Sequence, residues 1–250
     1  MIAMLLHQSS VLPEAVPVMS PWVDADLGVP ADEVALALSN QDNRRVVKTH
    51  TPADGFPIWE GISVIAVYRH PLDVFFSLRK HNANVSERND DEPMRWPLDD
   101  AFRYFIEEEA DLDDFDRDKL ATVTQHYTQT VLSNRIPNLK ALHYADMRKD
   151  GRQTVELVAE AAKITVNASV IEDVAVATSF ASMKAKAADF APVGGTGYWK
   201  SDAKFFDSAS SGKWRGVLSN DQLNAYHARL EELVPDPDAR AWLEFGNSAS

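Results

Sequence analysis

The sequence predicts an α/β fold in which a central parallel sheet is flanked by helices on both faces. Residues 62–68 form a continuous apolar run rich in β-branched side chains, which is typical of a parallel strand buried on both faces. Residues 139–144 indicate another buried strand, and the helical patterns between the two favour parallel strands joined by helices. The 250 residues contain no internal repeat and no clear linker, so we expect a single domain, 1–250.

The elements expected before the first buried strand are short. Residues 1–8 form an apolar piece with helical character, and prolines then punctuate a loop that contains Ser-Pro-Trp at 20–22. Residues 31–39 have the spacing of a helix, and the apolar pair before Lys48 predicts a short strand over 46–48.

A helix is expected directly after the first buried strand. Pro71 suits the first turn of a helix and Asp73 places a carboxylate there, so we expect a helix from Pro71 to about Asn82. Residues 191–213, rich in glycine, serine and lysine, are expected to form a mobile loop, and Ser219 is a suitable N-cap. The remaining helices are expected over 98–109, 119–132, 151–162, 178–188, 219–233 and 239–245.

The composition is that of an ordinary globular protein, with 45% hydrophobic and 25% charged residues. No apolar run approaches the length needed to cross a bilayer, and residues 1–6 lack the basic region of a secretory signal. The sequence contains no cysteine, which excludes disulfides, thiolate nucleophiles and cysteine-ligated metals. These features favour a cytoplasmic protein.

The formal charge of −13 argues against general binding of nucleic acids, which requires a basic face. Acidic runs at 90–92 and 107–118 are expected to be solvated loops and helix faces. A local basic pocket can still attract a small anion. The residues that form such a local cluster in the sequence are Lys48, Arg69, Arg79, Lys80 and His81.

Ionisable residues follow the predicted strands, and open α/β sheets bind ligands at the carboxyl ends of their strands. His50 is a candidate general base, and Lys48, two residues earlier in an extended segment, shares its face. A base beside a fixed cation suits the transfer of an anionic group. Arg69 and Ser77 would hold a phosphate with a guanidinium fork and a hydroxyl near a helix N-terminus.

Each of these residues also has a purely structural interpretation, and taken singly that interpretation is the more common one. His50 would then be a satisfied loop residue, and Lys48 a solvated strand end. Arg69 would pair with Asp73 as an ion pair at the start of a helix.

The Lys-Thr-His-Thr-Pro segment at 48–52 resembles the segment that carries the catalytic histidine in the cytosolic sulfotransferases. Arg69, with Ser77 eight residues later, is similar to that family's 3′-phosphate site. The resemblance continues in the same order along nearly the whole chain. Its further parts are Tyr144 after the second strand, Thr178-Ser179-Phe180 with Met183-Lys184, the Gly-x-Trp at Gly212-Lys213-Trp214, and Ser20-Pro21-Trp22 on the substrate side.

This resemblance implies a three-layer sandwich like that of P-loop NTPases, and a donor, 3′-phosphoadenosine 5′-phosphosulfate (PAPS). The implied reaction is in-line transfer of a sulfuryl group to a hydroxyl or amine of a small molecule, with no metal. Catalysis is assigned to His50 as general base and to Lys48, which neutralises the leaving phosphate. The implied donor-binding residues are Arg69 and Ser77 at the 3′-phosphate, Tyr144, Thr178 and Phe180 around adenine, and Lys213 and Trp214 in the C-terminal loop.

Two departures from the family pattern stand out. Residues 1–8 resemble the helix after the family's Pro-Lys-x-Gly-Thr-Thr-Trp loop, so we expect the chain to lack that loop and the strand before it. Residues 194–197 are glycine-rich but are not a Walker A motif. Asp207 stands where the family usually has a phosphate-binding arginine, and Lys204 or Lys213 is the hypothetical substitute.

These departures support an alternative, an inactive sulfotransferase-like binding protein that has lost donor binding. A nucleotide kinase is a weaker alternative, because no Walker lysine motif is present. An apolar acceptor pocket, suited to a phenol, alcohol or amine, is expected from Trp22, Phe75, Phe76 and residues 81–96. Ordinary core or lid packing explains those residues equally well.

Overall fold

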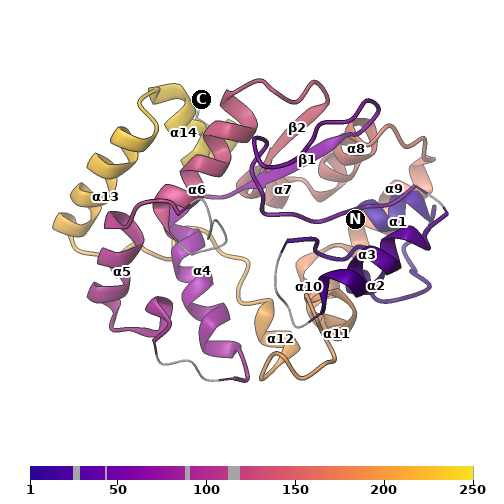
Figure 1. The fold of residues 1–250 in the computed structure, drawn as a ribbon, viewed down its shortest axis with the longest axis horizontal. Coiled ribbons are helices and arrows are strands. Elements are labelled where there is room, and N and C mark those ends of the chain that lie inside the picture. The colour runs from indigo at the N-terminus through magenta and orange to yellow at the C-terminus, as the bar shows by residue number, and fades with distance from the viewer. Residues whose placement is uncertain (25–28, 43, 88–90, 112–118, 250) are drawn as a thin grey trace. The chain divides into compact units, whose positions relative to one another are not determined.

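The structure is a computed structural model of the chain and describes residues 1–24, 29–42, 44–87, 91–111 and 119–249. Two compact units make up the chain, and Figure 1 labels their helices and strands. Unit 1 consists of Met1–His50, Asn84–Ser86 and Asp150–Asp207, and unit 2 of Thr51–Ala83, Glu87–Lys149 and Ser208–Ser250. The single domain stays a prediction.

Unit 1 is helical. Its helices are α1 (Ile2–Leu6), α2 (Val16–Met19), α3 (Ala31–Ser39), α8 (Gly151–Ala161), α9 (Ala168–Ala177), α10 (Phe180–Ala185), α11 (Ala187–Phe190) and α12 (Asp202–Phe205). Unit 2 contains the sheet. Its elements are β1 (Val64–Tyr68), α4 (Pro71–Asn84, whose last residue belongs to unit 1), η1 (Pro93–Arg95), α5 (Leu98–Glu107), α6 (Leu120–Tyr127), η2 (Thr128–Leu132), β2 (Leu139–His143), α7 (Tyr144–Lys149), α13 (Asn220–Leu233), α14 (Pro237–Phe245) and η3 (Gly246–Ala249). Within the described residues, no helix combines the length and apolar character needed to cross a bilayer.

The two predicted buried strands are present and pair in parallel, from Val64 opposite Leu139 to Tyr68 opposite His143. The prediction that the first strand is buried on both faces is wrong for Val67, which is 54% exposed. Its neighbours in β1 are buried because successive side chains point to opposite faces of a strand. The sheet has two strands within the described residues, so it is narrower than the central sheet expected from the sequence.

The predicted strand over 46–48 is wrong. Only Lys48 pairs, in a single parallel bridge with Trp22. The ladder cannot extend toward the N-terminus because Pro21 has no N–H to donate. Toward the C-terminus it stops because His50 gives its N–H to a side-chain carboxylate rather than to a backbone carbonyl.

Several helix boundaries follow the capping signals in the sequence. Helix α3 spans the predicted 31–39, and α4 begins at Pro71 as predicted but continues to Asn84. Helix α13 starts with a capping box. The hydroxyl of Ser219 accepts the N–H of Gln222 at 3.2 Å, and the Gln222 side chain accepts the N–H of Ser219 at 2.9 Å.

Three helical predictions need correction. The segment 119–132 is α-helical in its first part, α6, and continues as the π-helical η2. The segment 178–188 is divided into α10 and α11 at Lys186, which has φ −117° and ψ 41°. Helix α9 was not predicted, although Asn167 caps it by accepting the N–H of Val170 at 2.9 Å.

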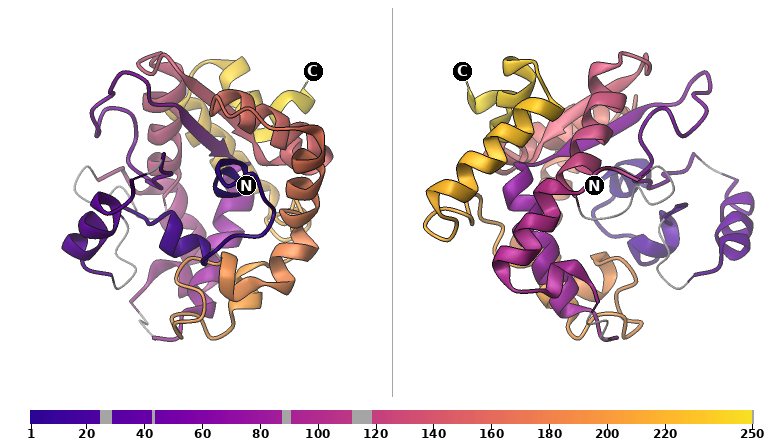
Figure 2. Two further views of the ribbon diagram at one scale, coloured as in Figure 1. Left: turned by 90° about the vertical axis from the view of Figure 1, so that its right-hand side faces the viewer. Right: turned by 60° about the vertical axis from the view of Figure 1, so that its left-hand side comes forward.

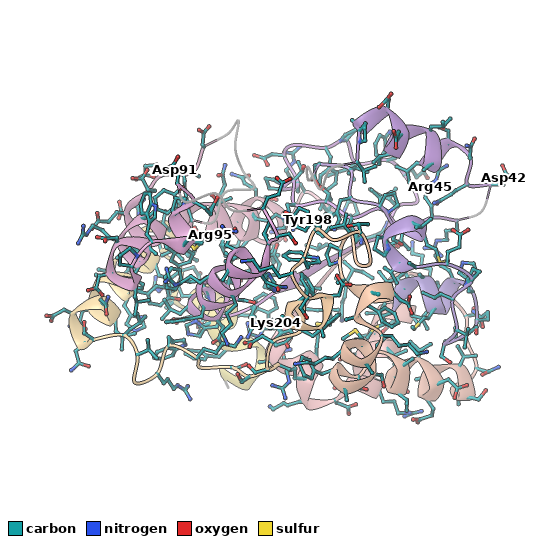
Figure 3. All side chains as sticks on the ribbon, turned by 90° about the horizontal axis from the view of Figure 1, so that it is seen from below. Asp42, Arg45, Asp91, Arg95, Tyr198 and Lys204 are labelled. Atoms are coloured by element: carbon teal, nitrogen blue, oxygen red, sulfur yellow. The ribbon has the colours of Figure 1, made fainter. Side chains whose placement is uncertain are left out.

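The glycine-rich segment 191–213 is more regular than the mobile loop predicted for it. It carries α12, and its backbone pairs with the last residue of α4 and with Ser86 beyond it. Ser86 donates its N–H to the carbonyl of Tyr198 at 2.8 Å, and Lys200 donates to the carbonyl of Asn84 at 2.7 Å (Figure 3 labels Tyr198).

Each unit has its own apolar core. In unit 1, α1, α8 and α9 pack together around Leu5, Val155 and Val174, all fully buried. In unit 2, the core joins the sheet to α4, α5, α6, α13 and α14, and α5 and α13 are seen beside each other in Figure 2. Phe75 and Phe105 lie at its centre with ring centroids 5.0 Å apart, and neither is exposed.

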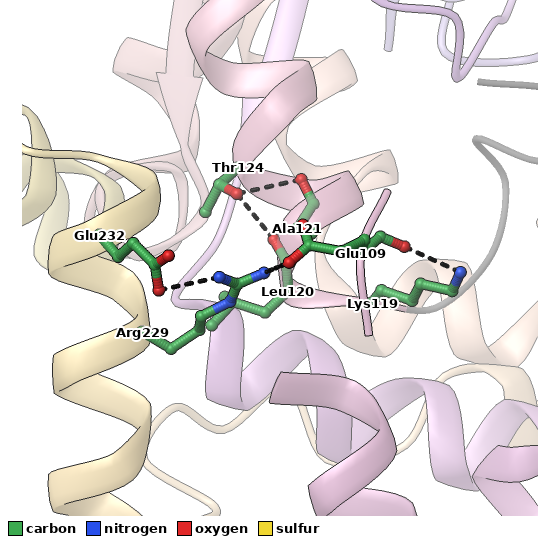
Figure 4. A network of polar contacts seen from close by, with 7 residues as sticks. All are labelled: Glu109, Lys119, Leu120, Ala121, Thr124, Arg229 and Glu232. Carbon is green, nitrogen blue, oxygen red and sulfur yellow. Dashed lines mark hydrogen bonds and ion pairs between the residues drawn. The ribbon is translucent and has the colours of Figure 1, made fainter. Parts of the chain in front are cut away.

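A polar network ties α13 to the ends of α5 and α6 within unit 2 (Figure 4). The guanidinium of Arg229 donates to Glu232 at 2.8 Å and to the side chain of Glu109 at 2.6 Å. The backbone carbonyl of Glu109 accepts from the ammonium of Lys119 at 3.0 Å. The hydrogen bonds to Glu232 and Glu109 raise the pKa of Arg229.

Candidate active site

The residues predicted for the site are divided between the two units. Unit 1 contains Lys48, His50, Thr178 and Phe180. Unit 2 contains Arg69, Ser77, Tyr144, Lys213 and Trp214.

In unit 1, the two predicted catalytic side chains contact one indole. The ring centroids of Trp22 and His50 are 4.3 Å apart, with an interplanar angle of 49°. The ammonium of Lys48 lies 5.4 Å from the centroid of the Trp22 ring. Lys48 and His50 therefore both contact the ring of Trp22. The shared face expected from their spacing stays a prediction. We call Trp22, Asp24, Lys48, Thr49 and His50 the His50 cluster.

The backbone of the His50 cluster is held by the turn that follows Trp22. Lys48 donates its N–H to the carbonyl of Pro21 at 3.2 Å and accepts the N–H of Val23 at 3.1 Å. A carboxylate oxygen of Asp24 then accepts the N–H of His50 at 2.9 Å and the hydroxyl of Thr49. Asp24 was not predicted, because a single aspartate in a proline-rich loop carries no pattern.

The two reactive groups of this cluster differ in their surroundings. His50 is an exposed residue. Lys48 is half-buried, and this burial lowers the pKa of its ammonium. An exposed histidine and a partly desolvated cation that contact the same indole suit proton removal and the stabilisation of nearby negative charge.

In unit 2, the carboxyl ends of the two strands meet. Because Tyr68 pairs with His143 in the register, the next residue of each chain segment is also a neighbour. The guanidinium of Arg69 lies 4.5 Å from the centroid of the Tyr144 ring. Two predicted donor-binding residues are thus in contact, as parallel strands that end at one edge require.

The segment after Ser208 is bound to the start of α4 by two side chains. Arg69 donates to the carbonyl of Ser210 at 2.7 Å. Asp73, which is 1% exposed, accepts the N–H groups of Gly212 and Lys213, each at 2.9 Å. The alternative in which Arg69 pairs with Asp73 is therefore wrong, because each of them binds this segment instead. The sequence placed Asp73 at the helix start but gave no sign of this distant partner.

Trp214 packs on a buried histidine. The ring centroids of His70 and Trp214 are 5.4 Å apart, and the guanidinium of Arg215 lies 5.2 Å from the Trp214 ring. Burial lowers the pKa of His70 to about 4, so its imidazole is neutral at pH 7 and accepts the N–H of Leu72 at 3.2 Å. His70 is therefore a support for Trp214 rather than a second base.

Unsatisfied donors in unit 2 suit an anionic ligand. Arg69 Nε and Trp214 Nε1 are buried and find no hydrogen-bond partner among the described residues. Ser77 lies one turn after Asp73 on α4, which places both on the face that binds the Gly212–Lys213 backbone. Buried donors of this kind ordinarily have an acceptor, so the residues present fit a phosphate.

Thr178 and Phe180 lie at the junction of α9 and α10. Thr178 ends α9, and its hydroxyl donates to the carbonyl of Val174 at 2.8 Å. Phe180 begins α10 with its ring 5.5 Å from the ammonium of Lys184. That ammonium donates to the backbone carbonyl of Asp207 at 3.0 Å, so a cation stands beside the residue that replaces the family's arginine. Lys204, one of the two hypothetical substitutes with Lys213, is exposed on α12 (Figure 3).

The residues expected to shape an acceptor pocket have different positions. Phe75 is fully buried in the core of unit 2, so the core interpretation holds for it. Phe76 is partly buried against the same core. Within the segment 81–96, residues 88–90 lie outside the described part of the chain. Of the predicted acidic runs, residue 90 and residues 112–118 also lie outside it.

Replacing Asp73 with alanine is expected to lower the free energy of unfolding by about 2–4 kcal/mol, because two N–H groups lose a charged acceptor in a buried place. Urea-induced unfolding measures the change. Asp221→Ala is the matched control, since Asp221 is also a first-turn aspartate but is exposed, and should cost less than about 1 kcal/mol. Equal losses in the two variants would contradict the role given to Asp73.

Arg69 follows β1, and Lys48 and His50 contact one indole. Residues of these types suit an enzyme that transfers a group from an anionic donor. Residues 6–236 match the family model described as Sulfotransferase domain, and the chain therefore belongs to the sulfotransferase family. Members of this family are transferases whose donor is PAPS.

Curated relatives and solved structures agree with this assignment. A glycolipid sulfotransferase of Mycobacterium tuberculosis is 27% identical over 273 residues, which cover 98% of this chain and 83% of the relative. One from Mycobacterium bovis (strain BCG) is 28% identical over 279 residues, with the same coverage.

Two solved structures show the same mixed α/β fold. A mouse sulfotransferase complexed with PAP has a TM-score of 0.70 and 17% identity, covering 97% of this chain and 81% of that one. Retinol dehydratase in a complex with retinol and PAP has a TM-score of 0.68 and 16% identity, covering 90% and 72%. The expected lack of the family's N-terminal strand and loop stays a prediction.

Proposed function

We propose that this chain transfers a sulfuryl group from PAPS to a hydroxyl group, with His50 as the general base. The observation that supports this most is the contact of Lys48 and His50 with one indole ring, with His50 exposed. An imidazole nitrogen of His50 takes the proton of the acceptor hydroxyl as that oxygen attacks. The Lys48 ammonium stabilises the negative charge that grows on the leaving phosphate.

The donor supplies the sulfuryl group, and the chain holds its nucleotide. We assign the 3′-phosphate to Arg69 and Ser77, which is supported by the buried Nε of Arg69 without a partner among the described residues. Further contacts to the nucleotide are assigned to Tyr144, Thr178, Phe180, Lys213 and Trp214. The three-layer sandwich of the family and a cytoplasmic setting, supported by the lack of cysteine, belong to the same proposal.

The acceptor class is proposed from the curated relatives. They are glycolipid sulfotransferases, so we propose a sugar hydroxyl of a glycolipid as the acceptor, within the broader class of small-molecule alcohols, phenols and amines.

One observation favours a second candidate, a sulfotransferase-like protein that does not bind the donor. Asp207 stands in the place of the family's phosphate-binding arginine, and a carboxylate there repels phosphate. The Lys184 ammonium on the Asp207 carbonyl offsets this charge and favours the active protein.

The two candidates are separated by a titration and a transfer assay on the whole chain. Calorimetry with PAP (3′,5′-adenosine bisphosphate) should give micromolar binding, and radiolabelled PAPS should label a glycolipid acceptor. No PAP binding by a folded sample would support the inactive protein. Binding without transfer to any glycolipid, phenol, alcohol or amine would overturn the proposed reaction.

A further inference from the structure

We propose that Trp22 and Asp24 are the positioning residues of the His50 cluster: Asp24 holds the His50 backbone, and Trp22 holds the imidazole and the Lys48 ammonium with its ring. The catalytic part of this inference rests on the proposed function. The placement itself does not, because it concerns contacts within unit 1.

Asp24 acts on the backbone. In a parallel ladder the N–H of His50 would next bond to the carbonyl of Val23, but a carboxylate oxygen of Asp24 takes that bond at 2.9 Å. The same oxygen accepts the Thr49 hydroxyl, so one charged acceptor fixes two successive residues. Hydrogen bonds to an ionised acceptor are about twice as strong as neutral ones. The ladder therefore ends at a defined place, and the exposed His50 side chain starts from a fixed backbone.

Trp22 acts on the side chains. Its ring lies 4.3 Å from the imidazole of His50 and 5.4 Å from the ammonium of Lys48. The negative face of an indole attracts cations. It supports the charge on Lys48, which burial opposes, and it attracts the imidazolium that forms when His50 accepts a proton.

The indole nitrogen gives an independent sign that the ring is constrained. Trp22 Nε1 is buried and finds no hydrogen-bond partner among the described residues. A buried donor without an acceptor is costly, and such atoms in native proteins require an explanation. The ring lies where it contacts Lys48 and His50, although its own N–H has no acceptor there among the described residues. A positioning role requires this arrangement.

Two charged residues belong to the His50 cluster: Lys48 in the same segment, and Asp24, which accepts the His50 N–H. Trp22 carries no charge, so a substitution there changes the ring contact without changing the net charge.

The first test is an NMR titration of His50 in the whole chain, assigned with His50→Gln. In Trp22→Leu the pKa of His50 should fall by about 0.5 unit, because the imidazolium loses the indole face. In Trp22→Phe, which keeps an aromatic face, the pKa of His50 should fall less. Trp59→Leu is the control, since Trp59 is a 63% exposed tryptophan of unit 2, and it should leave the titration unchanged. An unchanged pKa in a folded Trp22→Leu sample would overturn the role of Trp22.

The second test is hydrogen exchange of the His50 amide. Asp24→Ala should speed this exchange at least about tenfold by removing the acceptor, and Asp24→Asn, which keeps an oxygen, should restore most of the protection. With sulfuryl transfer as the readout, turnover should fall in Asp24→Ala and recover in part in Asp24→Asn, while PAP affinity stays the same. Unchanged exchange in Asp24→Ala would overturn the role of Asp24.

These readouts separate this inference from the proposed function. If the wild-type chain transfers no sulfuryl group but the titration and exchange change as stated, the placement stands and the reaction is wrong. If transfer is observed but neither measurement changes, the reaction stands and the positioning roles are wrong.

Discussion

Replacing His50 with alanine is expected to lower the turnover number for sulfuryl transfer by about 10²–10⁴-fold, the range that general acid–base catalysis contributes. The affinity for PAP should stay within about twofold, since we assign the nucleotide to other residues. The fold should persist because His50 is exposed, and the bond that it makes to Asp24 uses its backbone N–H. Steady-state kinetics with saturating PAPS, together with calorimetry, measures both quantities.

A control variant of another exposed histidine shows whether the loss of turnover is specific to the proposed base or follows the removal of any imidazole. His7 is exposed and belongs to unit 1, so His7→Ala should leave turnover unchanged. His50→Gln keeps a polar side chain of similar size but cannot serve as a base at neutral pH, and it should be as slow as His50→Ala. Normal turnover in either His50 variant would remove this residue from the mechanism.

The parts of the candidate site that lie at strand ends were predictable from sequence. An apolar run specifies a buried strand, and two parallel strands in register bring the next residues together. Arg69 and Tyr144 come into contact for this reason, although they are 75 residues apart in the sequence. Local sequence signals likewise predicted the start of α4 at Pro71 and the N-cap of α13 at Ser219.

The contacts that hold the site together were not predictable, because they join distant segments through single side chains. Asp73 binds the backbone of Gly212 and Lys213, and nothing near Asp73 in the sequence marks that loop as its partner. Asp24 takes the N–H of His50 in the same way. These carboxylates have no spacing rule, unlike a capping box or a strand, so only the structure reveals them.

Replacing Arg69 with alanine is expected to weaken PAP binding by about 100-fold or more, since charge-assisted hydrogen bonds to a phosphate contribute about 1.5–3 kcal/mol each. Arg69→Lys keeps the charge but loses the planar fork and the stacking on Tyr144, and it should recover only part of the affinity. Arg103→Ala is the control, because the Arg103 side chain is 63% exposed in an ion pair with Asp100. Calorimetric titration of the whole chain gives the dissociation constants.

Arg69 also donates to the carbonyl of Ser210, so a weaker affinity alone does not distinguish a direct phosphate contact from a displaced loop. Adenosine 5′-monophosphate, which lacks the 3′-phosphate, resolves this. If Arg69 binds that phosphate, the wild-type chain prefers PAP to the monophosphate, and Arg69→Ala loses most of this preference. If the variant binds both nucleotides more weakly but keeps the wild-type ratio, the loss comes through the loop. The 3′-phosphate must then be bound by another residue, for which Lys184 beside the Asp207 carbonyl is the first candidate.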